Sequence, residues 1–166
     1  MASPKLVLTL LGVAGILLLI GVAAVLVLPI QPKLESPPPK PGLEPTREIQ
    51  LYGGEVGGTT FAFGLNPNNL TSPGPVIKIR DGEVVKIVFK NVGRIPHSFA
   101  IVPELDRDAP PLFQGAFIGT GARPVPSGEE GETIFKVIDK PGKYYYVCTV
   151  PGHIELGMWG VIVVEE

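Results

Sequence analysis

Three residues that can bind a soft metal ion stand close together in the stretch CTVPGHIELGM, residues 148–158. Cys148 is the only cysteine of the 166-residue chain, and Met158 is its only methionine after the first residue. His153 is one of two histidines, and the other, His97, lies far upstream. A chain that is so sparing of sulfur and imidazole, yet groups them in one segment, indicates a chemical role for that segment.

The types of these residues point to copper. Two imidazoles and a thiolate in a trigonal plane, with a weak thioether along the axis, form the ligand set of a blue copper site. Zinc prefers four N, S or O donors in a tetrahedron and rarely takes a thioether. Taken singly, each residue has an ordinary explanation. A lone cysteine on a strand, for example, is usually a small buried hydrophobic residue. Taken together, they predict a site for one copper ion, with the ligands His97, Cys148, His153 and Met158.

The part of the chain that must position these ligands, Glu48 to Glu166, has the sequence pattern of a β domain. Short runs rich in Val, Ile, Tyr and Phe are separated by glycine and proline turns, and no run shows capped helical periodicity. The run GPVIKIRDGEVVKIVFKN predicts two strands joined in a hairpin at Asp81-Gly82, and ETIFKVID and KYYYVC repeat the pattern around Pro141-Gly142. Regularly spaced strands of this kind predict an antiparallel sandwich or barrel, and about 120 residues suffice for its core.

The expected strands place the candidate ligands near one another. His97 follows a strand that ends near Asn91, and Cys148 ends the strand KYYYVC. His153 and Met158 lie on the loop before a closing strand, WGVIVVEE. A loop that folds back can therefore bring these two residues to the cysteine, and a neighbouring strand can add the remaining histidine.

The strings VIKIRDGEVVKIVFKNVGRIPHSF and GKYYYVCTVPGHIELGMWGVIVV closely resemble sequences of the cupredoxins, or type 1 blue copper proteins. The resemblance covers residues 48–166, and the spacing C-x4-H-x4-M is similar to that of sulfocyanin- and rusticyanin-like members. It implies an all-β Greek-key β-sandwich with one type 1 copper at one end, held by the same four ligands. It also implies that the protein is not an enzyme but carries single electrons between respiratory partners by Cu(II)/Cu(I) cycling.

Two positions depart from the pattern of many cupredoxins. The residue after the first histidine is often Asn, with a backbone N–H that donates to the cysteine sulfur; here it is Ser98. The backbone contact is expected to remain, but the side-chain tie to Thr149, which follows the cysteine, is expected to be shorter or absent. Plastocyanin-like proteins have Tyr before the cysteine as an electron route, and Val147 leaves that route without its tyrosine.

The N-terminal part of the chain predicts a membrane anchor and a linker. The run from Leu6 to Leu28 carries no charge and is apolar apart from Thr9. Its 23 residues extend about 35 Å as a helix, enough to cross a bilayer core of about 30 Å. We expect residues 1–28 to form a transmembrane anchor and residues 29–47 a proline-rich stalk. The alternative is a cleaved signal peptide, whose apolar core is usually shorter.

Composition and charge narrow the classes of function. A net charge of −2 provides no basic patch for nucleic acid. Catalytic copper usually needs an open position and further histidines, whereas both histidines of this chain are candidate ligands. Copper delivery or storage is the remaining alternative, and it favours exposed Met or His clusters over one buried axial methionine.

These observations lead to an expected location and expected partners. We expect a single-pass protein of the cell membrane, with its copper domain on the extracytoplasmic side. The positive charges that follow the apolar run would by themselves favour the opposite orientation, so this expectation rests on the copper chemistry. Its partners would be redox proteins such as a terminal oxidase or a quinol-oxidising complex.

Overall fold

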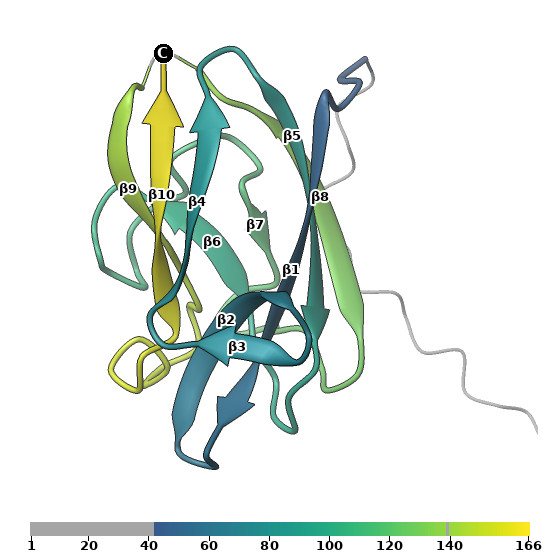
Figure 1. Cartoon of the computed structure of the whole chain (residues 1–166), viewed down its shortest axis with the longest axis vertical. Helices are drawn as coiled ribbons and strands as arrows, with labels where there is room; N and C mark the ends of the chain where they lie inside the picture. Colours follow the sequence, from purple (N-terminus) through teal and green to yellow (C-terminus); the bar gives the residue numbers. More distant parts are fainter. Residues whose placement is uncertain (1–41, 139) are drawn as a thin grey trace, which may run out of the picture. The chain divides into compact units, whose positions relative to one another are not determined.

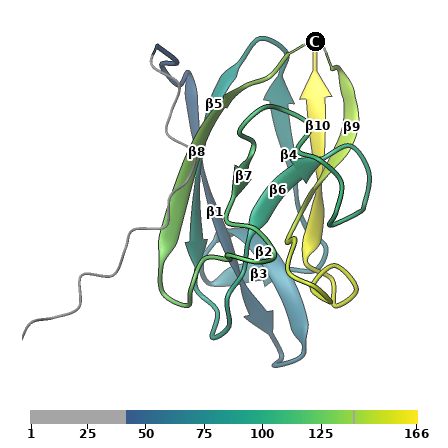
Figure 2. The same cartoon turned by 180° about the vertical axis from the view of Figure 1, so that it is seen from behind.

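Alternation of buried and exposed side chains along the strands generates two sheets that face each other across one core (Figures 1 and 2). The computed structural model describes residues 42–138 and 140–166. In β8 (Glu130–Lys136), buried and more exposed residues alternate along most of the strand. β10 (Trp159–Glu165) alternates between half-buried and buried residues in the same way, as expected for a strand with one face in the core.

The first sheet has the strand order β3-β2-β1-β5-β8. Besides β8, its strands are β1 (Arg47–Val56), β2 (Thr60–Asn66), β3 (Asn69–Thr71) and β5 (Val84–Asn91). β1 pairs with β2 in the antiparallel direction and with β5 in the parallel direction. The parallel pair runs on past β5, because Val92 N–H donates to the carbonyl of Gly53 at 2.9 Å. The segment that leads from β5 to His97 therefore starts beside the end of β1.

The second sheet has the strand order β4-β10-β9-β6-β7. Its other strands are β4 (Gly74–Arg80), β6 (Phe99–Val102), β7 (Phe117–Ile118) and β9 (Gly142–Val147). β10 pairs with β4 in the parallel direction and with β9 in the antiparallel direction. Both views show β4, β10 and β9 on one side of the domain and β1, β5 and β8 on the other (Figures 1 and 2).

Large side chains from both sheets fill the space between them. Phe63 is fully buried, and its ring makes edge contacts with Phe89 of the same sheet and Tyr146 of the opposite sheet, at centroid distances of 6.1 and 5.2 Å. The hydroxyl of the buried Tyr146 donates to the carbonyl of Pro75 at 2.6 Å, so its polar end is satisfied. Burying one apolar side chain of this size contributes about 1.5–3 kcal/mol. Because many such side chains are buried between the two sheets, this core is the main source of stability.

The all-β sandwich prediction is confirmed, but the predicted hairpin at Asp81-Gly82 is wrong because β4 and β5 belong to different sheets. Asp81 N–H donates to the carbonyl of Glu165 in the second sheet, whereas Gly82 N–H donates to the carbonyl of Val137, which follows β8 of the first sheet. The turn is thus an arch between the two sheets. Gly82 has a φ of 77°, which an arch can use as well as a hairpin, and strand alternation looks the same in both.

Two further features of the topology differ from the sequence-based expectation. The connection from β8 to β9, around Pro141-Gly142, also passes from one sheet to the other instead of closing a hairpin. The sheets are not purely antiparallel, because the pairs β1–β5 and β4–β10 are parallel. Both differences have one cause: alternation reports which face of a strand is buried, but it does not report which strand lies alongside.

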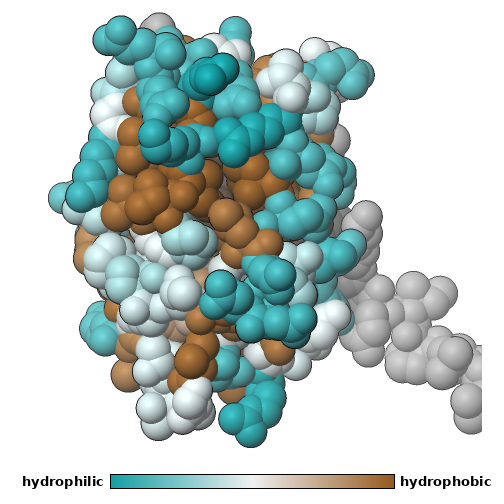
Figure 3. Space-filling model, in the orientation of Figure 1, coloured by the Kyte–Doolittle hydropathy of each residue, from teal (hydrophilic) through white to brown (hydrophobic). Residues whose placement is uncertain are grey.

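The long connection between β6 and β8 packs against β8 of the first sheet. Phe113 is buried and its ring stacks on Phe135 of β8 at 5.7 Å between centroids. A second small cluster of buried residues lies outside this core and consists of Ala100, Val102 and Val147. Partly buried neighbours such as Phe117 and Ile154 pack against it. Apolar side chains are also seen among hydrophilic ones on the face shown in Figure 3.

The predicted transmembrane anchor, residues 1–28, lies outside the described residues, and so does the predicted stalk up to residue 41. Within residues 42–138 and 140–166, no helix is long and apolar enough to cross a membrane. β1 begins at Arg47, which is the last residue of the predicted stalk.

Candidate metal centre

The structure brings three of the four predicted ligands together at one end of the sandwich. His97 lies between β5 and β6, Cys148 directly follows β9, and His153 lies in the loop between β9 and β10, coloured yellow in Figure 1. One possible ligand atom of each residue lies within 4.8 Å of the others, and all three residues are buried. The prediction that these side chains converge is therefore confirmed.

The facing atoms are those that a metal would use. His97 Nδ1 lies 3.1 Å from His153 Nδ1, which in turn lies 3.3 Å from Cys148 Sγ. Donors that sit about 2.0–2.3 Å from one metal ion lie roughly 3–4 Å from one another. Without an ion, protons on these groups can bridge the contacts as hydrogen bonds, whereas a bound cation would accept all three lone pairs at once. The arrangement thus fits a cation bound by two Nδ1 atoms and a thiolate.

Backbone hydrogen bonds fold the loop between β9 and β10 into this arrangement. Cys148 N–H donates to the carbonyl of Met158 at 3.1 Å, and Met158 N–H donates to the carbonyl of His153 at 2.8 Å. Gly152 and Gly157 have φ values of 83° and 98°, which L side chains rarely adopt, and they allow the loop to reverse. The spacing between cysteine, histidine and methionine therefore matches the length of a loop that returns to its starting point.

Met158 is placed beside the three clustered side chains. It is fully buried, and its backbone is bonded to both Cys148 and His153. Its methyl group approaches β1 so closely that a Cβ on Gly53 would lie 2.8 Å from it, so Gly53 makes room for this side chain. The role of Met158 as the fourth, axial ligand stays a prediction.

Ser98, which directly precedes β6, contacts the cysteine sulfur. Its N–H donates to Cys148 Sγ at 3.3 Å, as expected, and its Oγ lies 3.6 Å from the same sulfur. Burial raises the pKa of the Cys148 thiol, and these two contacts with Ser98 act in the opposite direction. The contacts with Ser98 and a bound cation would therefore both favour a thiolate at this position.

The side-chain tie between Ser98 and Thr149, which we expected to be shorter or absent, is present. Thr149 N–H donates to Ser98 Oγ at 2.8 Å, and the two hydroxyl oxygens also lie 2.8 Å apart. The serine is short, but β6 and the residues after β9 lie close enough for its hydroxyl to reach. The side-chain tie across the site is therefore complete without an asparagine.

Burial keeps both histidines neutral. The pKa of His97 is lowered to about 4, mainly by its burial away from solvent and to a smaller extent by repulsion from His153. Burial also lowers the pKa of His153. A metal-binding imidazole must be deprotonated at the ligating nitrogen, so near neutral pH both rings are ready to bind.

Phe61 covers the two imidazoles. Its ring centroid lies 5.5 Å from that of His97 and 4.3 Å from that of His153. His97 has no exposed surface and His153 keeps 6%, so the histidine on the loop is the one nearer to solvent. The sequence carried no signal for Phe61, because a phenylalanine on a strand is usually a core residue.

Asn91 organises the segment that carries His97. Its side-chain amide donates to the carbonyls of Ile95 and Val125 at 2.8 and 2.9 Å, and its Oδ1 accepts from Gly93 N–H. His97 itself exchanges two backbone hydrogen bonds with Val125. A polar residue that ends an apolar strand was the available signal for this role, and sequence reasoning did not use it.

An acidic residue, Glu55 on β1, also faces this segment. Its side chain is only 9% exposed, and Oε1 lies 3.5 Å from His97 Nε2. Burial alone would raise the pKa of this carboxyl, but hydrogen bonds from the backbone of Arg94 and Ile95 lower it below its usual value. Glu55 is therefore a charged carboxylate next to a candidate ligand, and nothing in the sequence indicated this.

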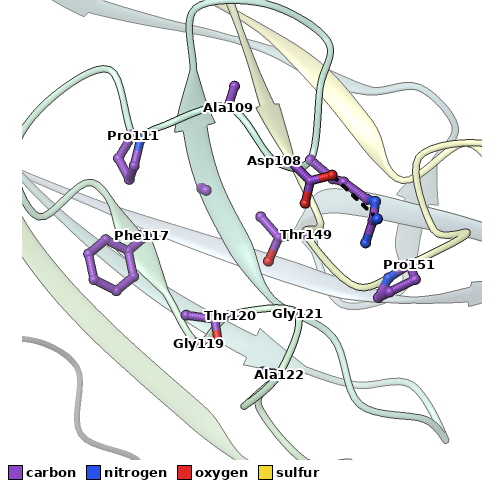
Figure 4. A pocket seen from close by; sticks show the side chains of 12 residues that line it. Asp108, Ala109, Pro111, Phe117, Gly119, Thr120, Gly121, Ala122, Thr149 and Pro151 are labelled. Atoms are coloured by element: carbon purple, nitrogen blue, oxygen red, sulfur yellow. Dashed lines mark ion pairs between the residues drawn. The ribbon is translucent and has the colours of Figure 1, made fainter.

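A hollow of about 660 Å³ adjoins the site (Figure 4). Its wall is largely apolar, with Phe117 and Pro111 on one side, and Thr149 and Pro151 connect it to the loop that carries the ligands. Arg107 and Asp108 pair with each other at 3.3 Å on its edge. The residues that line the hollow include no histidine or cysteine, so it is separate from the metal centre.

Comparison with known proteins identifies the family. Residues 62–165 match the family described as copper binding proteins, plastocyanin/azurin family, and the chain belongs to this family. The chain is similar to rusticyanin from Acidithiobacillus ferrooxidans, with 39% identity over 94 residues that make up 55% of this chain and 50% of that protein. It is also similar to the copper-resistant cuproprotein CopI of Rubrivivax gelatinosus, with 36% identity over 96 residues, 54% of this chain and 56% of that one.

Solved structures agree with this assignment. A structure of rusticyanin superposes with a TM-score of 0.54 at 26% identity, covering 74% of this chain and 80% of that one. A blue copper oxidase from Nitrosomonas europaea superposes with a TM-score of 0.53 at 27% identity, covering 72% of this chain and 38% of that one. The chain spans about half the length of the rusticyanin and CopI sequences that it matches.

Family and geometry together define the metal. The chain is a cupredoxin, and its cluster of His97, Cys148, His153 and Met158 is consistent with one type 1 copper ion. The individual assignment of these four side chains as ligands stays a prediction, which substitution of each can test.

Proposed function

We propose that the protein is a membrane-anchored type 1 copper protein that carries single electrons between respiratory redox partners. The observation that carries the proposal is the enclosed donor set: a cysteine sulfur and two imidazole nitrogens within 4.8 Å, all buried. When bound, copper would supply a one-electron Cu(II)/Cu(I) couple. The similarity to rusticyanin supports an electron carrier.

The ligand residues suit rapid electron transfer because they are already in place. Cys148, His153 and Met158 are fixed by hydrogen bonds within one loop, and His97 is fixed by its bonds with Val125. A compact site that holds two soft sulfur donors and two nitrogens suits both oxidation states. Little therefore has to move when an electron arrives or leaves.

Catalysis at the metal is disfavoured by burial. His97, Cys148 and Met158 have no exposed surface, and Phe61 lies over both imidazole rings. A catalytic metal site keeps an open position for water or substrate. The proposed role is therefore electron transfer without catalysis, in line with the absence of further histidines in the chain.

Copper delivery or storage is the alternative function. The similarity to CopI, which is named a copper-resistant cuproprotein, supports this alternative. Delivery requires that a ligand can leave and that a partner can reach the ion. Met158 is fully buried and His153 is 6% exposed, so the ion would be hard to reach. A measurable exchange of bound copper with a chelator within minutes would support delivery over electron transport.

Two features of the sequence support the proposed location. The uncharged run from Leu6 to Leu28 is long enough for a membrane anchor, and the proline-rich residues 29–47 would tether the copper domain near the membrane. We place this domain on the extracytoplasmic side, where a terminal oxidase or quinol-oxidising complex would be its partner. Cell fractionation and protease accessibility of the folded domain in intact cells would test this placement.

The proposed entry point for electrons is the apolar surface around His153. Leu156 lies on the loop that carries His153 and is 48% exposed, and its carbonyl accepts from Phe61 N–H at 3.0 Å, next to both imidazoles. An apolar patch with few charges favours small, short-lived interfaces, which suit a mobile carrier. Docking there should depend only weakly on ionic strength.

The first experiment is to load the protein with copper and to compare it with Cys148→Ser. The wild-type protein should bind one copper and absorb intensely near the red end of the visible spectrum when oxidised. The serine variant should lose this band and keep its β-sheet circular dichroism, because β9 ends before this side chain. Intense visible absorption in the variant would refute the site, and a colourless wild-type protein would refute the proposed function.

A further inference from the structure

The segment from Gly93 to His97 is held against the end of β1 by one carboxylate. Glu55 Oε2 accepts from Arg94 N–H at 2.9 Å, and Oε1 accepts from Ile95 N–H at 3.1 Å. The side chain is 9% exposed, so these bonds are made largely away from water. A charged acceptor in such a setting makes strong hydrogen bonds, and Glu55 therefore ties the strand to the segment that presents His97.

The glycines on both sides show that this close approach is built into the chain. A Cβ on Gly93 would lie 2.7 Å from Glu55 Oε2 and 2.8 Å from Gly54 Cα. A Cβ on Gly54 would lie 3.0 Å from the nitrogen of Gly93. Neither position can take a larger residue without moving the backbone, so both glycines serve the contact between β1 and this segment.

One atom of His97 remains without a hydrogen-bond partner. Nδ1 faces His153 at 3.1 Å, inside the metal centre, and Nε2 points the other way. Nε2 is buried and makes no hydrogen bond with the described residues, and its neighbour at 3.5 Å is Glu55 Oε1. When Nδ1 binds a metal, the proton of the neutral ring must sit on Nε2, where a buried N–H needs an acceptor.

We propose that Glu55 is a positioning residue of the metal centre, whose carboxylate accepts the Nε2–H of His97. In this role it selects the tautomer that leaves Nδ1 free, orients the ring and makes Nδ1 a stronger donor. A negative charge on the far side of a ligand also stabilises Cu(II) more than Cu(I), so Glu55 lowers the reduction potential. The inference rests on the proposed copper site but not on the protein's being an electron carrier.

The first test needs no copper. Nitrogen NMR of the histidine side chains in the metal-free full chain reports which ring nitrogen of His97 carries the proton. We expect the proton on Nε2 in the wild-type protein and a mixture of tautomers in Glu55→Ala. A wild-type His97 with its proton on Nδ1 would overturn the proposal, and this result does not depend on whether any variant folds.

The second test measures the reduction potential of the copper-loaded full chain. Glu55→Gln keeps the shape of the side chain and removes its charge, and we expect it to shift the Cu(II)/Cu(I) equilibrium towards Cu(I) by roughly tenfold, about 59 mV upwards. Glu155→Gln is the matched control, because it removes one exposed carboxylate from the loop that carries His153. It should produce a clearly smaller shift.

The outcomes separate this inference from the proposed function. Equal shifts in Glu55→Gln and Glu155→Gln, or no shift in either, would overturn the role of the hydrogen bond to His97, while the wild-type protein remains a copper carrier. A wild-type chain that binds no copper would instead refute the proposed function. In that case the tautomer of His97 still decides whether Glu55 positions the ring.

Discussion

Replacing Ser98 with alanine should lower both the reduction potential and the stability, and the structure allows the two effects to be worked out separately. The variant keeps the backbone N–H that donates to Cys148 Sγ at 3.3 Å. It loses the hydroxyl, which lies 3.6 Å from the same sulfur and accepts from Thr149 N–H at 2.8 Å. The first loss acts on the metal centre, and the second acts on the fold.

The expected magnitudes follow from these distances. The 2.8 Å bond is strong, and leaving a partly buried N–H of Thr149 without its acceptor should cost about 1–3 kcal/mol of stability. The contact with sulfur is long, so its loss should be worth about 0.5–1 kcal/mol of differential stabilisation. A donor to the thiolate weakens its bond to Cu(II), so removing it favours Cu(II). With about 59 mV for a tenfold change, the potential should fall by about 20–40 mV.

Optical redox titration and denaturant unfolding of the same preparation measure the two effects. Thr149→Val is the matched control: it removes the hydroxyl that lies 2.8 Å from Ser98 Oγ and leaves both the backbone N–H and the serine in place. Its potential should stay within about 10 mV of wild type on this reasoning, because no contact with sulfur is lost. A potential of Ser98→Ala that is unchanged or higher would show that the serine hydroxyl does not donate to the sulfur.

Three further predictions concern the axial ligand, the histidines and the docking surface. Met158→Leu should keep copper and raise the reduction potential, because a weak donor that favours Cu(II) is lost. The lost stabilisation of Cu(II) of about 1–2 kcal/mol corresponds to an increase of about 40–90 mV on redox titration. A lower potential would show that Met158 is not a ligand. In the metal-free protein, burial lowers the pKa of His97 to about 4, below the 6.5 of an exposed imidazole. Between these two pH values the histidine is protonated in the unfolded state but not in the folded state. Stability measured by denaturant should therefore fall as the pH drops from 6.5 to 4, by up to about 1.4 kcal/mol per unit, and a flat profile would contradict this. Leu156→Lys, at a site that is 48% exposed, should slow electron transfer to a partner oxidase and leave the visible spectrum unchanged, whereas an unaffected rate would move the docking surface elsewhere.

The chemistry of the site could be read from the sequence because it depends on residue types that are scarce in this chain. One cysteine, two histidines and one internal methionine leave few ways to build a soft metal site. Three of them lie on one loop, where the distance along the chain limits the distance in space. The all-β character was equally accessible, since period-2 alternation, as along most of β8, follows directly from one buried and one more exposed face.

The partners of each strand were decided only by the tertiary structure. The Asp81-Gly82 turn has the same local sequence chemistry in an arch as in a hairpin, and the pairing of β5 with β1 and β8 depends on packing across the whole core. Contacts that rely on this pairing join residues far apart in the chain. Glu55 reaches His97 only because β1 runs parallel to β5, and Phe61 covers both imidazoles only because β2 lies beside β1. Such contacts leave no local pattern, because the free energy that selects them comes from burying the two sheets against each other.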